Sequence, residues 1–284
     1  MKIIKYTDAE EFYNRVVSFL EEDEAVNNLA LGILSSLKKN ENAYGKIKPF
    51  LAIVENDGNI KLVMIMTPPY NLQILGNVSI EVINFTIDYL IRENIEIPGI
   101  IGRKELCEKF VGVWTNKTPI IHKVSMNQRI YKLEKVNKVQ DSAGCFKIAE
   151  EKDSEILVKW LMEFNKYIGE DTDKDKAERQ IINLINKKRA YLWVNEIPVT
   201  MVLAGRETKN GIIVSGVYTP EEFRRNGYAT SCVAEVSKIL LDEGYKFCTL
   251  YTDLSNPTSN RIYQKIGYEP IADSIMYNFK KNRR

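Results

Sequence analysis

The sequence predicts a mixed α/β protein, of the α+β kind, built from two domains with the same order of elements. Three observations carry this prediction. A length of 284 residues suits two domains that each bury a core. Apolar residues switch between helical and strand spacing along the chain. The order helix, helix, three strands, helix, strand, helix, strand occurs twice, as expected for a tandem repeat.

The first half opens with an N-cap signal. Asp8 is followed three residues later by Glu11, and apolar residues then recur at helical spacing. Asp57-Gly58 lies between two apolar runs and predicts a hairpin, because glycine tolerates a positive φ. Spacing predicts the other elements: helices at about 26–37, 79–92 and 104–114, strands at 50–54, 60–65, 72–75 and 98–102, and further strands up to residue 133.

The second half repeats this pattern. Asp153 or Ser154 is the expected cap of a helix that extends to about Ile168. Further helices are predicted at about 177–187, 229–241 and 258–265, and strands at 190–195, 199–204, 211–218, 247–251 and 270–279. The polar segment that ends at Gly144 predicts a linker. We therefore expect an N-terminal domain at 1–134, a linker at 135–145 and a C-terminal domain at 146–284.

Composition excludes several classes of protein. The formal charge is only +2, which argues against a dedicated nucleic-acid or membrane-surface binder. No apolar run approaches the roughly 18 residues of a spanning helix, and the first residues do not resemble a signal peptide. The four cysteines are far apart and form no zinc or disulfide pattern. We therefore expect a soluble, cytoplasmic protein without a metal site.

The single histidine, His122, lies in an apolar, strand-like run. A serine or cysteine triad needs an imidazole beside its nucleophile, and a transition-metal site usually needs several nitrogen or sulfur ligands. We therefore interpret His122 as a structural residue and do not expect histidine-based chemistry.

One loop distinguishes the two halves. The first half passes from Leu75 to its next helix through three residues, whereas the second half inserts residues 219–228 at the matching place. In the second half, a strand is followed by a turn that contains Gly227 and then by the start of a helix. This order brings unpaired backbone N–H groups together, and these donors favour the binding of an anion. Arg224 and Arg225 add positive charge suited to phosphate. The loop has neither a Walker nor a Gly-x-Gly-x-x-Gly pattern, so nucleotide hydrolysis and dinucleotide binding are disfavoured.

Two motifs in the second half resemble those of the GNAT superfamily of acyl-CoA-dependent N-acetyltransferases. Residues 224–229, Arg-Arg-Asn-Gly-Tyr-Ala, are similar to its Arg/Gln-x-x-Gly-x-Gly/Ala signature, with Ala229 where many members have glycine. Residues 253–268 are similar to its later motif, in which an Asn precedes a short helix that ends near a Tyr. The resemblance covers about 146–279. It implies two tandem GNAT-like domains, each a mixed, mostly antiparallel sheet flanked by helices, with a degenerate N-terminal copy.

The resemblance also implies a set of cofactor contacts. Backbone groups of Val217, Tyr218 and Thr219 would lie along the pantetheine arm, and Asn256 and Ser259 would contact the arm from the other side. The pyrophosphate would be held by the loop that carries the signature, through Arg224, Arg225, Asn226, Gly227, Tyr228, Ala229 and Thr230.

The implied reaction transfers an acetyl group from acetyl-CoA to a primary amine of a small molecule or a protein, by direct attack in a ternary complex. Tyr263 is the expected general acid that protonates the thiolate. The base stays open between Asp253, Glu207 and a chain of waters. The acidic segment 170–175 would attract a cationic acceptor.

Two other interpretations remain open: an acyl-CoA-binding sensor without turnover, and a scaffold in which both halves are inactive. The expected partners are a small-molecule or protein amine, and neither nucleic acid nor membrane. The sequence is compatible with a monomer or a homodimer.

Overall fold

The computed structural model describes residues 1–140, 142–169 and 172–281, and these residues form two compact units. The N-terminal unit holds residues 1–130, 253–255 and 271–281. The C-terminal unit holds the described residues of 131–252 and 256–270. Asp141 of the predicted linker, Glu170 and Asp171 of the predicted acidic segment and residues 282–284 lie outside the described residues.

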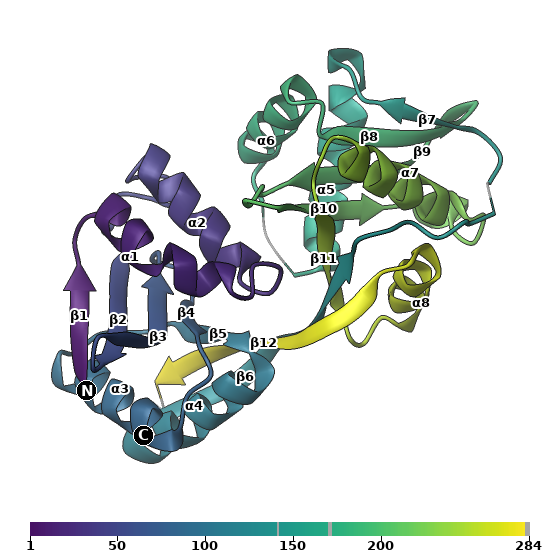
Figure 1. The fold of residues 1–284 in the computed structure, drawn as a ribbon. Coiled ribbons are helices and arrows are strands. Elements are labelled where there is room, and N and C mark those ends of the chain that lie inside the picture. The colour runs from purple at the N-terminus through teal and green to yellow at the C-terminus, as the bar shows by residue number, and fades with distance from the viewer. Residues whose placement is uncertain (141, 170–171, 282–284) are drawn as a thin grey trace. The chain divides into compact units, whose positions relative to one another are not determined.

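The sheet of the N-terminal unit has the order β1-β2-β3-β4-β5-β12 (Figure 1). Neighbouring strands are antiparallel, except that β4 and β5 are parallel. Its elements in chain order are β1 (Lys2–Tyr6), α1 (Ala9–Glu21), α2 (Asn28–Lys39), β2 (Phe50–Asn56), β3 (Asn59–Met66), β4 (Leu72–Leu75), α3 (Ile80–Arg92), β5 (Gly99–Arg103), α4 (Lys104–Lys117) and most of β6 (Ile120–Leu133).

Two local signals in this unit are confirmed. The Oδ1 atom of Asp8 accepts a hydrogen bond from the Glu11 N–H at 2.7 Å, as an N-cap does. Asp57 and Gly58 have φ values of 51° and 81°, which suits the tight turn between β2 and β3. Both faces of the sheet are then covered: α3 and α4 enclose one apolar cluster, and α1 and α2 enclose another (Figure 1).

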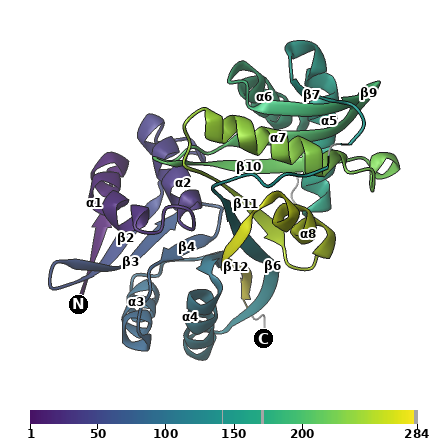
Figure 2. The ribbon, with the colours of Figure 1, turned by 45° about the vertical axis from the view of Figure 1, so that its right-hand side comes forward.

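The C-terminal unit repeats the arrangement with the strand order β11-β10-β9-β8-β7. Its pairs are antiparallel, except that β10 and β11 are parallel. Helix α7 runs along β10 (Figure 2). The elements are β7 (Cys145–Ile148), α5 (Ser154–Tyr167), α6 (Lys174–Asn186), β8 (Ala190–Asn195), β9 (Ile197–Gly205), β10 (Gly211–Tyr218), α7 (Tyr228–Asp242), β11 (Phe247–Asp253), α8 (Pro257–Ile266) and the start of β12 (Glu269–Lys281).

Each face of this second sheet has its own core. One apolar cluster lies under α7 and α8, and the other lies under α5 and α6. Side chains on a strand alternate between the faces. At the end of β10, Val217 therefore packs against the α7/α8 cluster and Tyr218 against the α5/α6 cluster.

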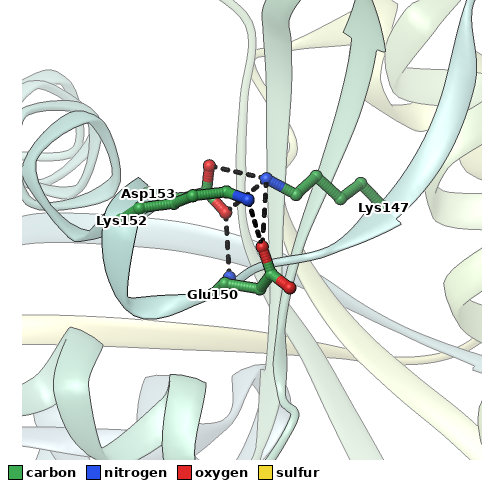
Figure 3. Close-up of polar contacts among 4 residues, drawn as sticks. All are labelled: Lys147, Glu150, Lys152 and Asp153. Atoms are coloured by element: carbon green, nitrogen blue, oxygen red, sulfur yellow. Dashed lines mark hydrogen bonds and ion pairs between the residues drawn. The ribbon is translucent and has the colours of Figure 1, made fainter.

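The start of α5 is anchored to β7 by a cluster of charges (Figure 3). The side chain of Asp153 precedes α5 but does not cap it. Its carboxylate instead accepts from the Glu150 N–H at 2.8 Å and binds Lys147 Nζ, while the Glu150 side chain accepts in return from the Asp153 N–H. Glu150 also pairs with Lys152 at 2.6 Å. The expected cap is thus replaced by a reciprocal box one turn earlier.

Two strands were missed by the sequence analysis. β1 and β7 each pair with the next strand of their unit and form the first edge of its sheet. Both are short and partly exposed, so apolar alternation is weak in them. Each copy therefore begins with a strand rather than with a helix.

The last strand contributes to both units. Residues 271–281 of β12 belong to the N-terminal unit, where Ser274–Asn278 pair antiparallel with Gly99–Arg103 of β5. The predicted domain boundaries at 1–134 and 146–284 describe the repeat in the sequence and stay a prediction.

His122 is exposed on β6, and its ring meets the ring of Tyr277 edge-on at 5.5 Å. Among the described residues, no helix is long and apolar enough to cross a bilayer.

Candidate functional site

The end of β10 departs from regular sheet structure. The parallel pairing of β10 with β11 covers only Gly211–Ile213 and Phe247–Thr249. Further along β10, its register with β9 shifts between Ser215 and Tyr218, and Gly216 adopts a φ of 56°. A bulge of this kind re-aims the strand. Residues 214–218, which include the bulge, thus extend beyond the part of β10 that pairs with β11.

The loop that follows exposes a row of backbone donors. Gly227, with a φ of 82°, is the N-cap of α7, and no side chain caps the helix there. Arg225 also has a left-handed φ, 67°, which is unusual for a residue with a side chain. Within the described chain, none of the backbone N–H groups of residues 225–230 donates a hydrogen bond. This geometry leaves six amides, together with the positive end of the α7 dipole, available to an anion.

The loop holds this shape through bonds of its own. The Phe223 N–H donates to the Pro220 carbonyl at 3.0 Å, and Arg224 Nε donates to the Thr219 carbonyl at 3.0 Å. Asn226 Nδ2 donates to the Phe223 carbonyl at 3.1 Å. The side chains of Arg224 and Asn226 therefore shape the loop from within. Arg224, Arg225, Asn226 and Gly227 are exposed.

Two residues of the signature turn their side chains inward. Tyr228 is buried in the α7/α8 cluster, where its hydroxyl accepts a hydrogen bond from Asn195 Nδ2 at 3.0 Å. Thr230 is also buried, and Ala229 is half-buried. Their backbone N–H groups, rather than their side chains, are the atoms left for a ligand.

The second motif forms the start of α8. Asn256 caps this helix: its Oδ1 accepts from the Ser259 N–H at 3.1 Å, and its carbonyl accepts from Asn260 Nδ2 at 2.7 Å. The two predicted cofactor contacts, Asn256 and Ser259, thus bind each other. Their remaining polar atoms are the Asn256 amide nitrogen and the Ser259 hydroxyl.

Tyr263 lies on α8 with only 7% of its side chain exposed. Its ring meets that of Tyr268 edge-on, with centroids 5.9 Å apart. Burial raises the pKa of Tyr263 well above its ordinary value, so the phenol is neutral at physiological pH.

The two sequence-predicted candidates for the base already have partners. Asp253 ends β11, and its Oδ1 accepts from both the N–H and the hydroxyl of Ser255 at 2.7 Å. Glu207 lies 3.8 Å from Arg189 Nε, which itself binds Glu243 through another nitrogen. Neither carboxylate is therefore poised as an unbound base in this geometry.

Sequence reasoning missed one pair. Tyr218, at the end of β10, donates its hydroxyl proton to Glu163 Oε2 on α5 at 2.8 Å. Burial and this hydrogen bond raise the pKa of Tyr218 to about 12. The ring of Trp160, one turn before Glu163, lies 6.3 Å from the Tyr218 ring. The only signal in the sequence is the helical spacing of Trp160 and Glu163, which is too common to indicate a site.

The N-terminal unit contains a cavity of about 820 Å³. It lies at the turns after β4 and β5, the places that match the loop and the second motif of the other copy. Arg103 and Asp23, both of which line it, form an ion pair. The lining holds as many acidic as basic side chains: Glu22, Asp23, Glu105, Asp273, Lys61, Arg103, Lys104 and Lys109.

Each unit has a mixed sheet with one parallel pair of strands. In the C-terminal unit, a bulged strand leads to a glycine at the start of a helix. Together these features define the GNAT class of fold. Residues 195–276 match the model of the FR47-like protein family. The matched segment contains both of the motifs that carry the resemblance. It supports the resemblance inferred from residues 224–229 and 253–268.

Solved structures show the same fold over nearly the whole chain. A GNAT-family acetyltransferase from Colwellia psychrerythraea has a TM-score of 0.63 at 11% identity, covering 99% of this chain and 100% of that one. A GCN5-related N-acetyltransferase from Sphaerobacter thermophilus has 0.68 at 12% identity, covering 98% and 95%. A tandem GNAT protein from the clavulanic acid pathway has 0.57 at 8%, covering 99% and 98%. The predicted tandem GNAT fold is confirmed. No curated protein matches the sequence.

Proposed function

We propose that the C-terminal unit is an N-acetyltransferase that transfers the acetyl group of acetyl-CoA to an amine. The row of unbonded N–H groups at 225–230 is the observation that carries this proposal. Two left-handed residues, Arg225 and Gly227, hold the row open at the exposed start of α7. Concave sets of main-chain donors are suited to phosphate oxygens. The family match over 195–276 covers this loop, and the resemblance of residues 224–229 to the signature of acyl-CoA-dependent enzymes favours a pyrophosphate-bearing cosubstrate there.

The other predicted contacts complete the cosubstrate site in this proposal. Backbone groups of Val217, Tyr218 and Thr219 follow the bulge in β10 and serve the pantetheine arm. The free polar atoms of Asn256 and Ser259 contact the arm from α8. Arg224 acts through the loop conformation, because its side chain is bound to the Thr219 carbonyl. The cosubstrate supplies the acetyl group as a thioester.

The chain then has two tasks in the reaction. A backbone N–H near Val217 or Tyr218 stabilises the negative charge that develops on the carbonyl oxygen. The Tyr263 hydroxyl donates its proton to the departing sulfur. Burial raises the pKa of Tyr263, but a buried thiol responds in the same direction: burial alone raises the pKa of the Cys248 thiol to about 12. Burial therefore raises the basicity of a departing thiolate as well as the pKa of the phenol, which lessens the mismatch between proton donor and acceptor.

The acceptor must lose a proton before it attacks, since amines of the lysine type are protonated at neutral pH. Asp253, Glu207 and a chain of waters remain the candidates for this step. The N-terminal unit acts as a non-catalytic copy, because the turn from Leu75 to α3 lacks the inserted loop. We further propose that the protein works in the cytoplasm as a monomer or homodimer, on a small-molecule or protein amine.

Two measurements on the full-length protein test the proposal. Calorimetry should detect binding of CoA, and a free-thiol assay should detect consumption of acetyl-CoA in the presence of a panel of primary amines. Absence of CoA binding contradicts the cosubstrate site. Tight CoA binding without turnover on any amine contradicts the enzyme and supports a sensor.

A further inference from the structure

We propose that the Glu163 carboxylate binds the protonated amino group of the acceptor, and that Tyr218 holds this carboxylate in place. The acceptors are then amines that carry a positive charge at neutral pH, rather than anilines or hydroxyl compounds. This inference rests on the proposed acetyltransferase function and names the substrate class for its site.

The position of the Tyr218–Glu163 pair follows from the course of strand β10. Tyr218 is the last residue of β10, directly after the bulge, where its backbone is assigned to the pantetheine arm. Its side chain points to the opposite face from that of Val217 and packs with the α5/α6 cluster. The 2.8 Å hydrogen bond from its hydroxyl fixes Glu163 Oε2 on that face. Glu163 is therefore linked through a single residue to the strand end that we assign to the cosubstrate.

The helix that carries Glu163 is also fixed. At its N-terminal end, Asp153 binds Lys147 of β7 and the Glu150 N–H (Figure 3). In its second turn, Trp160 is 4% exposed and packs near the Tyr218 ring. The helix backbone that carries Glu163 is therefore held in place, and the Tyr218 hydroxyl holds its carboxylate, which suits a binding residue.

The charge of Glu163 is the strongest indication of a ligand. The residue is half-buried, yet the one hydrogen bond that its side chain accepts from the described part of the chain comes from a neutral hydroxyl. Among the described residues, no Lys, Arg or His nitrogen lies within 4.0 Å of it. Fully buried carboxylates are almost always paired, and Glu163 is partly removed from water without a cationic partner among the described residues. Oε1 makes no hydrogen bond to any residue that the structure describes, and an ammonium group would give it a charge-assisted bond.

Tyr218 stays a donor at physiological pH. Burial, and then the adjacent Glu163 carboxylate, raise the pKa of its phenol to about 12. Glu222 raises this pKa further and Arg224 lowers it. The phenol therefore keeps its proton, continues to bind Oε2 and leaves Oε1 to the ligand.

The test measures amine binding directly, with CoA present at saturation. Butylamine, 1,4-diaminobutane and Nα-acetyl-lysinamide are titrated into the full-length protein by calorimetry, with butan-1-ol as the uncharged match for butylamine. We expect at least one amine to bind and butan-1-ol not to bind. Glu163→Gln should weaken amine binding by about tenfold or more, because it removes the charge and keeps the shape.

Three further variants make the result specific. Glu155→Gln removes a carboxylate from the exposed first turn of the same helix and should leave amine affinity unchanged. Glu163→Asp keeps the charge and should restore part of the affinity. Tyr218→Phe should weaken binding by less than Glu163→Gln does. The melting temperature and the CoA affinity of each variant confirm that it is folded.

Two outcomes overturn the inference: equal amine affinity in wild type and Glu163→Gln, or no binding of any of the three amines to the wild type. Each of these two outcomes can be distinguished from a failure of the proposed acetyltransferase function. Acetyl-CoA consumption that is unaffected by Glu163→Gln contradicts Glu163 alone. Amine binding through Glu163 without acetyl-CoA consumption contradicts the transferase alone.

Discussion

Lys147 Nζ lies 2.8 Å and 2.7 Å from the two carboxylate oxygens of Asp153, and this contact ties β7 to the start of α5 (Figure 3). Asp153 is almost fully buried, so loss of its charge removes the closer carboxylate partner of Lys147 and leaves only Glu150, at 3.9 Å. The ion pair joins the short edge strand β7, which pairs with β8, to the helix that carries Glu163.

The first prediction concerns this ion pair and pH. Burial raises the pKa of Asp153, but the hydrogen bonds from Lys147 and from the Glu150 N–H together bring it below 3.8. The pair therefore contributes stability above the unfolded pKa and loses it as the pH falls through the lower folded pKa. Asp153→Asn should cost about 2 kcal/mol of unfolding free energy at neutral pH. The difference from wild type should shrink below about pH 4.

Urea unfolding across the pH range measures this effect. Glu151→Gln, at an exposed position of the same turn, is the matched control and should change stability little. A difference between wild type and Asp153→Asn that stays constant down to the acid limit contradicts the ion pair as the source.

The second prediction concerns the phosphate loop. Gly227→Glu should lower CoA affinity by about 100-fold or more, because a carboxylate enters the row of amides and repels the pyrophosphate. The φ of 82° at this position also strains a side chain by about 1 kcal/mol. Gly227→Asn is the control, since asparagine tolerates this conformation and carries no charge. Calorimetric titration with CoA separates charge from strain. Similar losses in both variants would show that conformation alone matters.

The third prediction concerns proton donation. Tyr263→Phe removes one oxygen from a buried ring and leaves the packing against Tyr268 intact. We expect kcat to fall by about 100-fold, while the dissociation constant of CoA changes by less than about twofold. Steady-state kinetics on the best amine of the panel, together with CoA titration, gives both values. An unchanged kcat would mean that Tyr263 only packs and that the proton comes from elsewhere.

The fourth prediction concerns the bulge in β10. A Cβ on Gly216 would lie 2.7 Å from Leu203 Cδ1, and its φ of 56° disfavours a side chain. Gly216→Ala should cost about 1–3 kcal/mol of unfolding free energy. It should also weaken CoA binding, because the bulge aims the strand end. Gly205→Ala on β9, where the nearest atom to a new Cβ is 3.8 Å away, should be close to neutral in both thermal melts and CoA titration.

Most of the fold follows from local signals. The apolar periods predicted β8 at 190–195 and β10 at 211–218 with the bounds that the structure shows. Asp57 and Gly58 predicted their hairpin, since the turn itself needs a positive φ. Edge strands β1 and β7 were missed because one side of each is unpaired and partly exposed, and such strands have no strong apolar period.

The candidate site is predictable only in part. The loop was visible because glycine and arginine stand at informative places between a strand and a helix. The left-handed φ of Arg225 was not visible, since it results from the loop closing on itself. The bond between Tyr218 and Glu163 joins residues 55 positions apart and depends on how α5 packs on the sheet. No local pattern contains that information.

The final strand has a consequence for how this chain can fold. Ile275 and Tyr277 of β12 are buried in the core of the N-terminal unit, and the strand pairs with β5 there. During synthesis, the N-terminal sheet therefore stays without one of its strands until residues 271–281 have left the ribosome. A gene fragment that stops after the linker should yield an N-terminal half with an open, apolar sheet edge, prone to self-association.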